Sequence, residues 1–540
     1  MYKVFEIREK NIVRKNLLRA DIKVAICYPS IYRVAVSSLG YQLIYFLLNS
    51  QEEIACERAV LSSQKGPEPP VKTLESGSPL KFFDIIIFSV HYELDYPNIA
   101  RMLLASGINP LKHKRGLKDP IVVVGGPPIT ANPVPLESIA DVLYIGEAEY
   151  SLLKLVYEIH ALENRKDLYK ISDIKGVYVP GSETRAQRAW VRDLDKAFHP
   201  SSQIIPLSDK SEFQPVFGRA AQLEVTRGCG RGCRFCLLGY SFRPYRERSF
   251  PVIESLLKKI IEKNGVLKIV LIGSSLSDYK YLQKLLETCI EENIQASLPA
   301  LRTDAVEDEV LELIPRLGQR TLTFAPETSI RLRIKLNKPI ENSEIIEKTE
   351  NAVAKGVKNI KLYFLYGVPG ESKQDLIEIV ELVKRIKNKV KLSKENIRVS
   401  INPLIPKAHT PLQWTVIEEV SILRRKRRFL LEKLGSLARV EGYDPFEAQI
   451  QALLSLGGSQ LGEIVAYVAE AGGGRQAWRK ALRRFQINVQ KYLEKTIAKE
   501  PWSVVDVGVS RDFLEKEYKK FHEGILTPPC STFCSKCGVC

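Results

Sequence analysis

Short apolar runs that alternate with helical stretches are the feature that most restricts how this chain of 540 residues can fold. In the first part, strands are predicted at 23–27, 84–90, 121–124 and 142–145, with a break at Tyr28 and Pro29. Helices are predicted at 38–48, 97–106 and 150–160. Strands that alternate with helices favour an α/β fold, and here an open parallel sheet of the Rossmann type. Ligands of such sheets bind at the carboxyl ends of the strands.

The middle of the chain repeats the same unit. Strands are predicted at 223–226, 268–273, 296–301, 321–327, 359–365 and 398–402, each followed by polar or glycine-rich residues. Six such units can form a partial (β/α)6 barrel, whose chemistry lies in the loops at the carboxyl ends of the strands. Residues after about 441 are predicted to form further helices.

One loop after the first barrel strand carries Cys229, Cys233 and Cys236, with glycines at 228, 230 and 232. Thiolates hold iron–sulfur clusters, and three ligands on a four-iron cubane leave one iron open to a substrate or cofactor. Glycine lets the backbone wrap closely around such a cluster. A zinc knuckle and three unrelated cysteines are the alternatives, and the spacing disfavours both.

The last eleven residues contain four more cysteines, Cys530, Cys534, Cys537 and Cys540. Four thiolates close a metal site, which makes it structural or electron-relaying. The spacing fits a second iron–sulfur cluster or zinc, and the sequence does not separate the two. Because seven of the ten cysteines lie in these two groups, the composition favours metal binding in a reducing compartment over disulfides.

The formal net charge is +17, which favours anionic partners such as RNA or an anionic cofactor. A basic surface without such a partner is the alternative, and the run Arg424–Arg428 on a predicted helix can be a solvated face. The charged N-terminus lacks the apolar core of a signal peptide, and no apolar run is long enough to span a bilayer. These features predict a cytoplasmic protein.

The cysteine loop resembles the cluster motif of radical S-adenosylmethionine (radical SAM) enzymes, and the chain resembles the branch with an N-terminal cobalamin-binding-like domain and a cysteine-rich tail. This resemblance implies that the open iron binds SAM and that an electron from the cluster cleaves it to methionine and a 5′-deoxyadenosyl radical. The expected domains are a cobalamin-binding-like domain with linker at 1–200, a radical SAM core at 215–440, a helical region at 441–525 and a metal-binding tail at 526–540.

The strand ends supply the candidate cofactor residues. Ser274, Ser275 and Asp278 can hydrogen-bond the SAM amino group or ribose, and Gly273 allows a close backbone approach. Arg333 can pair with the SAM carboxylate. The resemblance implies a ribose contact for Glu327 and an adenine cradle for the backbone of Gly367 and Gly370. The candidate residues for SAM binding are therefore Gly273, Ser274, Ser275, Asp278, Glu327, Arg333, Gly367 and Gly370.

In the N-terminal sheet, the turns at Gly125-Gly126 and Gly146-Glu147 resemble those that receive cobalamin. The motif Asp-x-His-x-x-Gly, whose histidine ligates cobalt in many such domains, is missing, so bound cobalamin is expected to lack a protein imidazole. A domain that only scaffolds or docks substrate is the alternative.

The sequence therefore predicts an iron–sulfur radical SAM enzyme that modifies an unactivated carbon, with cobalamin-dependent methylation as the favoured reaction. A ferredoxin or flavodoxin is expected as reductant. A tRNA- or rRNA-modifying enzyme without cobalamin and a non-catalytic iron–sulfur assembly protein remain as alternatives. No catalytic residue is assigned, since His409 can transfer protons or simply brace its loop.

Overall fold

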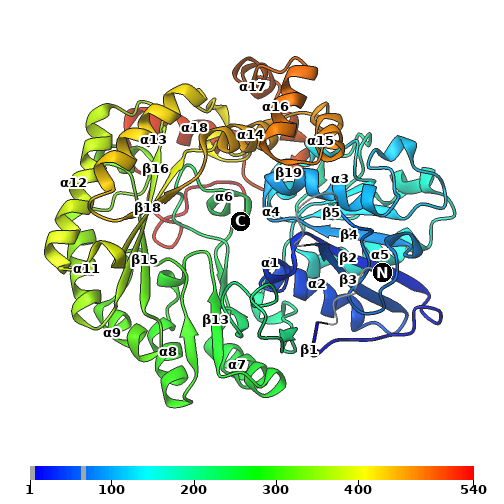
Figure 1. Ribbon diagram of the computed structural model, residues 1–540, viewed down its shortest axis with the longest axis horizontal. Coiled ribbons are helices and arrows are strands. Elements are labelled where there is room, and N and C mark those ends of the chain that lie inside the picture. Colours follow the sequence, from blue (N-terminus) through cyan, green and yellow to red (C-terminus); the bar gives the residue numbers. More distant parts are fainter. Residues whose placement is uncertain (1–6, 63–67) are drawn as a thin grey trace. The chain divides into compact units, whose positions relative to one another are not determined.

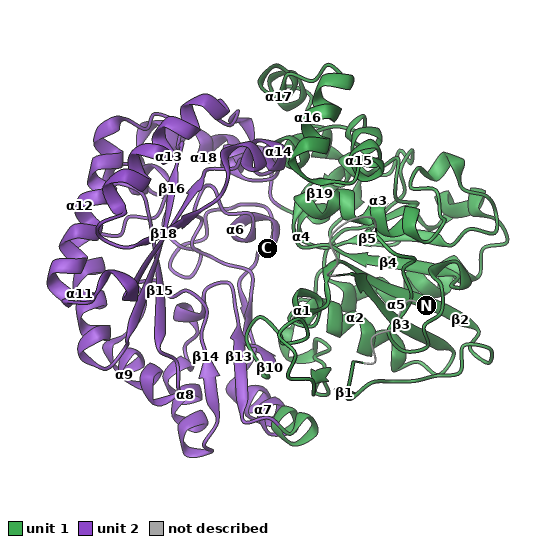
Figure 2. Cartoon of the chain, in the orientation of Figure 1, with its two compact units in different colours: residues 1–221, 259–265, 453–508 green, residues 222–258, 266–452, 509–540 purple. Residues whose placement is uncertain are grey.

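The computed structural model describes residues 7–62 and 68–540. The chain divides into two compact units, and each is described by itself (Figure 2). Unit 1 comprises residues 1–221, 259–265 and 453–508, and unit 2 comprises residues 222–258, 266–452 and 509–540.

Unit 1 is built on a six-stranded sheet in the order β3-β2-β4-β5-β6-β7 (Figure 1). Its strands are β2 (Ile22–Ile31), β3 (Ile54–Leu61), β4 (Ile85–Ser89), β5 (Ile121–Gly125), β6 (Val142–Tyr144) and β7 (Val177–Tyr178). The principal helices between them are α2 (Leu39–Asn49), α3 (Tyr96–Ala105) and α5 (Ala148–His160). Pairing is parallel except between β6 and β7, so the predicted open parallel sheet is confirmed.

Two details of this sheet differ from the prediction. The expected break at Tyr28 and Pro29 was wrong, because β2 continues to Ile31 and only shifts its register against β3 after Tyr28. A proline cannot donate to the ladder, and an irregularity accommodates it without ending the strand. The strand β3 was not predicted at all.

The strand order reverses direction at one point of the sheet. β2 lies between β3 and β4, so the chain leaves β2 first toward one neighbour and then toward the other. This reversal is the topological switch point, where ligands of doubly wound sheets bind beside the carboxyl ends of the strands. We call the space outside the carboxyl ends of β2 and β4 the switch crevice.

Unit 2 holds the barrel strands, in the sheets β10-β13-β14 and β15-β16-β17-β18. Their bounds are β10 (Ala221–Glu224), β13 (Lys268–Ile272), β14 (Gln295–Ser297), β15 (Thr321–Glu327), β16 (Asn359–Tyr366), β17 (Ile397–Pro403) and β18 (Arg439–Gly442). A parallel bridge between Leu301 and Phe324 joins the two sheets into one arc. The six predicted strands are present, and β18 adds an unpredicted parallel strand beside β17.

Helices cover the outer face of this arc, as expected for repeated βα units (Figure 1). They are α7 (Phe250–Asn264), α8 (Leu282–Glu291), α9 (Asp308–Arg316), α11 (Asn342–Ala354), α12 (Lys373–Val390) and α13 (Val420–Leu434). The loops that follow the strands therefore gather at the carboxyl edge of the arc.

The predicted C-terminal helices are α14 (Pro445–Leu456), α15 (Leu461–Glu470), α16 (Gly474–Arg484), α17 (Val489–Ile497) and α18 (Arg511–Glu523). They divide between the units: α15 packs on α3 of unit 1, whereas α18 packs within unit 2 against the short helix α10 (Ile330–Lys335). Residues 525–540 follow α18 without a further helix or strand.

Candidate active site

The cysteine loop lies between β11 (Thr226–Arg227) and α6 (Leu238–Ser241), at the carboxyl edge of the arc. Gly228 begins it with a φ of +76°, and a Cβ there would overlap the carbonyl oxygens of Phe242 and Pro244. Only glycine allows both this conformation and this close approach. The first residue of the loop is therefore packed tightly against the backbone of the segment that follows α6.

Backbone N–H groups point at the loop sulfurs. The amide of Arg231 donates to Sγ of Cys229 at 3.5 Å, and the amides of Leu238 and Gly239 donate to the thiol of Cys236. Such bonds favour the thiolate form that binds metal. Backbone N–H groups thus reach the sulfurs of Cys229 and Cys236.

Burial and, after it, the nearby charge of Cys233 nevertheless raise the pKa of Cys229 to about 11 and that of Cys236 to about 12. The three thiols are therefore close enough to repel one another as anions. Iron would supply the positive charge that offsets this cost and would release the thiol protons on binding. The donor set fits a cluster with three thiolate ligands.

A guanidinium lies against the third thiol. Nη1 of Arg302 lies 3.6 Å from Sγ of Cys233, while the same side chain pairs with Asp304 at 2.7 Å. Burial alone would lower the pKa of Arg302, but Cys233 and Asp304 raise it above its ordinary value. Sequence reasoning missed Arg302, because its partner lies 69 residues away.

Buried hydroxyls mark the space beside the loop. In unit 2, among the residues that the structure describes, the hydroxyls of Thr226, Thr303, Thr328 and Tyr366 are buried and lack a hydrogen-bond partner within the protein. Buried polar atoms without partners are rare in folded proteins, and an ordered water or a ligand can complete them. Thr226 begins β11 just after β10, Thr303 and Thr328 come after β14 and β15, and Tyr366 ends β16, so they lie along the edge where SAM is expected.

The predicted residues after β13 are partly taken up by protein contacts. Asp278 accepts a hydrogen bond from Ser275 at 2.5 Å and forms an ion pair with Arg231 of the cysteine loop. Ser274 is exposed, and a Cβ at Gly273 would lie 2.5 Å from Oγ1 of Thr226. Asp278 thus holds the cysteine loop, whereas Ser274 and the backbone of Gly273 remain for a ligand.

Glu327 ends β15 with a φ of +67°, and Nζ of Lys338 lies 2.7 Å from its Oε1. Arg333 is fully buried and donates to the backbone carbonyls of Thr328 and Ile340. Burial lowers the pKa of Arg333 to about 10. The structure gives Arg333 a bracing role within this loop, so a SAM carboxylate contact would require it to leave these partners.

The two glycines after β16 differ. A Cβ at Gly367 would lie 2.7 Å from Cδ2 of Leu423, and its N–H donates to Oε2 of Glu371 at 2.8 Å. At Gly370, where φ is +77°, no atom of the described chain lies within 4 Å of that position. Gly370 therefore has open space on its Cβ side, while its carbonyl accepts from Nη2 of Arg331 at 2.9 Å, and Gly367 serves the packing of α13.

The basic run on α13 is not a uniform surface. Lys426 pairs with Glu371 at 2.8 Å and with Glu418 at 2.7 Å, and it is half-buried. Arg424, Arg425 and Arg428 are exposed. The run is thus partly a structural clamp on the turn after β16.

His409 is buried, and its backbone N–H donates to Oε1 of Gln413 at 2.9 Å. Its φ of +56° places it in a tight turn of the loop after β17. These contacts show how the loop is braced and assign no proton transfer to this side chain.

The glycine turns of unit 1 lie at the carboxyl ends of β5 and β6, and both are filled by protein. A Cβ at Gly126 would overlap the carbonyl oxygen of Val90, and one at Gly146 would overlap that of Ala189. Gly125 packs against Tyr144. These glycines are required by neighbouring backbone, whatever else they contact.

The switch crevice carries different residues. His91 follows β4 and is exposed; its Nε2 lies 3.2 Å from Oγ of Ser38, and its ring lies 5.5 Å from that of Tyr28. A Cβ at Gly40, in the first turn of α2, would meet Nε2 of His91 at an ordinary 3.8 Å. The side chains near the carboxyl ends of β2 and β4 are thus small or planar, and His91 among them is exposed.

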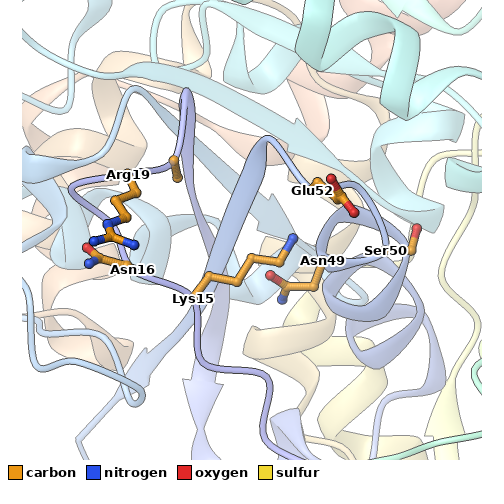
Figure 3. Close-up of a pocket in the computed structure, with 7 residues that line it drawn as sticks. Lys15, Asn16, Arg19, Asn49, Ser50 and Glu52 are labelled. Carbon is orange, nitrogen blue, oxygen red and sulfur yellow. The ribbon is translucent and has the colours of Figure 1, made fainter.

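Figure 3 shows an open surface pocket of about 390 Å³ elsewhere in unit 1. It is lined by the segment before β2 and by the end of α2, at Lys15, Asn16, Arg19, Ala20, Asn49, Ser50 and Glu52. These residues lie at the amino ends of β2 and β3, opposite the edge where ligands of parallel sheets bind. We assign it no role in the chemistry.

The tail cysteines lie in unit 2. The N–H of Cys530 donates to the carbonyl of Gly230 at 2.9 Å, and the carbonyl of Cys537 accepts from Ser510 at 2.8 Å. Within residues 7–62 and 68–540, no three His, Cys, Asp or Glu side chains converge on a point that could hold one metal ion. The thiolates that hold a four-iron cubane bind different irons and lie further apart than the ligands of a single ion. The result therefore concerns sites for a single metal ion and not sites for a cluster.

Family models match both units. One described as "Radical SAM proteins, N-terminal" matches residues 40–180, and one described as "Radical SAM superfamily" matches residues 223–383. An uncharacterized protein of Methanocaldococcus jannaschii is 30% identical over 453 residues, which are 82% of this chain and 90% of that protein. The chain belongs to the radical SAM superfamily.

This radical SAM protein also has distant relatives. A ribosomal protein uS12 methylthiotransferase of Clostridium perfringens is 24% identical over 251 residues, covering 44% of this chain and 53% of that enzyme. The radical SAM methyltransferase TsrM from Kitasatospora setae, with tryptophan and a SAM analog bound, superposes with a TM-score of 0.52 at 11% identity, covering 86% and 100% of the two chains. The cobalamin-dependent radical enzyme OxsB, with aqua-cobalamin bound, gives 0.52 at 13% identity over 96% and 82%. At such identities these similarities concern the fold.

The radical SAM protein is an enzyme, and its superfamily uses a [4Fe-4S] cluster, SAM and a reductant. The predicted α/β fold and the resemblance to this superfamily are confirmed, and the non-catalytic alternative is excluded. In the described part of the chain, no helix is long and apolar enough to cross a membrane.

Proposed function

We propose that this radical SAM enzyme is a cobalamin-dependent methylase whose cluster is held by Cys229, Cys233 and Cys236. The observation that carries the proposal is that one chain combines two candidate ligand sites, each at the carboxyl ends of parallel strands. One is the three-thiol loop beside unpartnered buried hydroxyls in unit 2, and the other is the switch crevice of unit 1. Proteins that superpose on this fold include the cobalamin-dependent radical enzyme OxsB.

When bound, the cluster supplies the electron that cleaves SAM, and cobalamin supplies methyl transfer. The protein's own residues hold and orient these groups. The loop amides and Arg302 donate to the thiolate sulfurs, which favours the metal-bound form. The hydroxyls of Thr226, Thr303 and Thr328 can accept or donate hydrogen bonds to the polar edges of SAM.

The switch crevice is the proposed place of cobalamin. Because Gly126 and Gly146 are packed against backbone, we propose that a flat ligand rests instead between α2 and the segment after β4, near Gly40 and His91. Nε2 of His91 already lies beside Ser38, so we expect cobalt to lack a protein imidazole ligand.

The first experiment tests the loop. After anaerobic reconstitution with iron and sulfide, we would incubate the protein with SAM and dithionite and measure 5′-deoxyadenosine by mass spectrometry. The wild type should form it, and the triple variant Cys229→Ala, Cys233→Ala, Cys236→Ala should not, because the cluster has lost its ligands. Cys289→Ala, which removes a buried thiol in α8, is the matched control. A triple variant that cleaves SAM at the wild-type rate would refute the assignment.

The second experiment tests cobalamin. Gly40→Trp places an indole in the switch crevice, and Gly116→Trp places one before β5, at the other edge of the sheet; a Cβ has ordinary 3.8 Å contacts at both positions. Wild type and Gly116→Trp should retain hydroxocobalamin after desalting, and Gly40→Trp should not. S-adenosylhomocysteine formed together with deoxyadenosine supports methylation.

A wild type that cleaves SAM yet retains no cobalamin would overturn this part of the proposal. Nitrogen splitting in the cob(II)alamin EPR spectrum that disappears in His91→Ala would contradict the expected absence of an imidazole ligand.

A further inference from the structure

The tail that follows α18 returns to the rear of the cysteine loop. The N–H of Cys530 donates to the carbonyl of Gly230, the residue that follows Cys229. A Cβ at Gly230 would lie only 3.2 Å from Cβ of Cys530. The first tail cysteine therefore contacts the loop between two of its cluster ligands, and the glycine at 230 makes room for it.

Several buried polar contacts hold the tail in this place. Asn337 donates to the carbonyls of Gly232 and Thr527, and it accepts from the N–H of Thr527 at 2.9 Å. On α18, Glu517 pairs with Arg234 of the loop at 3.0 Å, and both side chains are buried. The docking thus involves specific hydrogen bonds and a desolvated ion pair, as expected for a built contact.

Arg243 connects the two cysteine groups. Its guanidinium donates to the thiol of Cys537, its Nε donates to the carbonyl of Gly239 at 2.6 Å, and Nη2 lies 3.2 Å from the Cβ position of Gly232. The side chain is buried and lies over the ring of Phe513 at 5.4 Å. A buried cation is therefore placed beside the tail thiols and beside the loop that carries the first thiols.

The four tail thiols form a group of their own. Cys530, Cys534, Cys537 and Cys540 lie within eleven consecutive residues, and backbone hydrogen bonds to Gly230 and from Ser510 hold this segment at Cys530 and Cys537. Three of the four side chains are exposed, which allows them to turn toward a common centre. Four thiolates occupy every iron of a cubane and leave none for substrate.

We infer that the tail holds a second, fully thiolate-ligated iron–sulfur cluster that passes electrons to the cluster of the loop. In this step one electron leaves a reduced one-electron carrier of the flavodoxin or ferredoxin class, which is oxidised by one electron. The tail site accepts that electron and then gives it to the loop site, so the tail returns to its oxidised state. No bond forms or breaks, and no proton moves. The inference rests on the proposed role of the cysteine loop.

The test uses the full chain with the double variant Cys534→Ala, Cys540→Ala, which leaves the contact of Cys530 with Gly230 in place. Ser531→Ala with Ser535→Ala is the matched control in the same segment. Iron, sulfide and zinc are measured on anaerobically reconstituted protein, and the EPR signal of the reduced loop cluster is recorded with and without SAM. SAM cleavage is then followed with reduced flavodoxin and, separately, with dithionite.

The double variant should lose about four irons per chain and keep the SAM-sensitive EPR signal. Its rate of deoxyadenosine formation should fall by about tenfold or more with flavodoxin and stay unchanged with dithionite, a small reductant that reaches the loop site directly. Zinc in the wild-type tail, or an equal loss of rate with both reductants, would overturn the relay. If the loop assignment itself failed, the wild type would cleave no SAM with either reductant, while the iron count would still report on the tail.

A potentiometric measurement provides a second check. Hydrogen bonds from cations to cluster sulfur raise the reduction potential. Arg243→Gln should therefore lower the midpoint potential of the tail cluster, whereas Arg511→Gln, an exposed arginine on α18, should leave it unchanged. An unchanged potential in Arg243→Gln would contradict the placement of this cation beside the tail site.

Discussion

The ion pair between Arg234 and Glu517 should control the docking of α18 on the cysteine loop. Both side chains are buried, at 0% and 1% exposure, and the guanidinium also donates to the carbonyls of Lys335 and Ile525 at 2.8 and 2.7 Å. Arg234→Met keeps much of the volume but leaves the carboxylate of Glu517 without its main counter-charge. Removing one partner of a buried pair costs about 3–5 kcal/mol.

The lower end of this range applies, because Lys520 still lies 3.0 Å from Glu517 and is partly exposed. If the cost falls on the docking of α18, a loss of about 3 kcal/mol corresponds to roughly hundredfold faster amide exchange in residues 511–525. Native-state hydrogen exchange with mass spectrometry would measure it peptide by peptide. Arg511→Met is the control, since its pair with Glu515 on the same helix is exposed and is worth about 0.3–0.5 kcal/mol.

An exchange rate in Arg234→Met that matches the Arg511→Met control would refute this reasoning. Glu517→Gln added to Arg234→Met should recover part of the loss, because it removes the unpaired buried charge. A double variant less protected than the single one would show that the amide contacts of this region, and not its charges, dominate the docking.

Three further outcomes are expected. Arg302→Gln should lower the midpoint potential of the loop cluster, read by EPR-monitored titration, because a cation no longer donates to Cys233; an unchanged potential would contradict this role. Asp375→Asn should make the unfolding of α12 less sensitive to acid. Burial opposes ionisation of Asp375, but hydrogen bonds from Arg331, Ser329 and Ser372 lower its pKa to about 2. The ionised carboxylate therefore stabilises the fold at pH values above the ordinary pKa of aspartate, and this stabilisation is lost as the pH falls through the pKa of the folded state. Circular dichroism between those pH values checks this, and parallel acid transitions of variant and wild type would disprove it. Gly126→Ala should destabilise unit 1 by more than about 1 kcal/mol, because its Cβ meets the carbonyl of Val90 and its φ is +126°; an unchanged thermal transition would count against this packing.

The sequence predicted most strands of both units because these strands are continuous apolar runs. It did not predict the two strands, β3 and β18, that lack such a run. β3 contains Glu57 and Arg58, which read as polar and yet are buried, the arginine between Glu9 and Glu75. Their partners lie far along the chain, so no local pattern identifies the strand. β18 alternates between exposed and half-buried residues at the border of its sheet, and it carries little apolar signal.

The residues of the candidate site also differ in whether the sequence could predict their roles. Spacing within eight residues identified the loop cysteines, because cluster ligands on one loop leave a local signature. The surroundings of Asp278 and Arg333 depend on partners elsewhere in the fold, and the sequence could not tell that both are already engaged within the protein. Arg243 and Arg302 were missed for the same reason. Their importance follows from contacts with sulfur that only the folded chain displays.

The pairing of Arg234 with Glu517 has a consequence for biosynthesis. The two residues are separated by 283 positions, so the loop leaves the ribosome long before the helix that covers its rear exists. At about 5–20 residues per second, the interval is roughly 15–60 s. During that time the loop can take up iron from a carrier that approaches from the side later closed by the tail. In the folded chain α18 contacts this side of the loop through Glu517, so newly made protein should load its first cluster faster than apo-protein that has already folded.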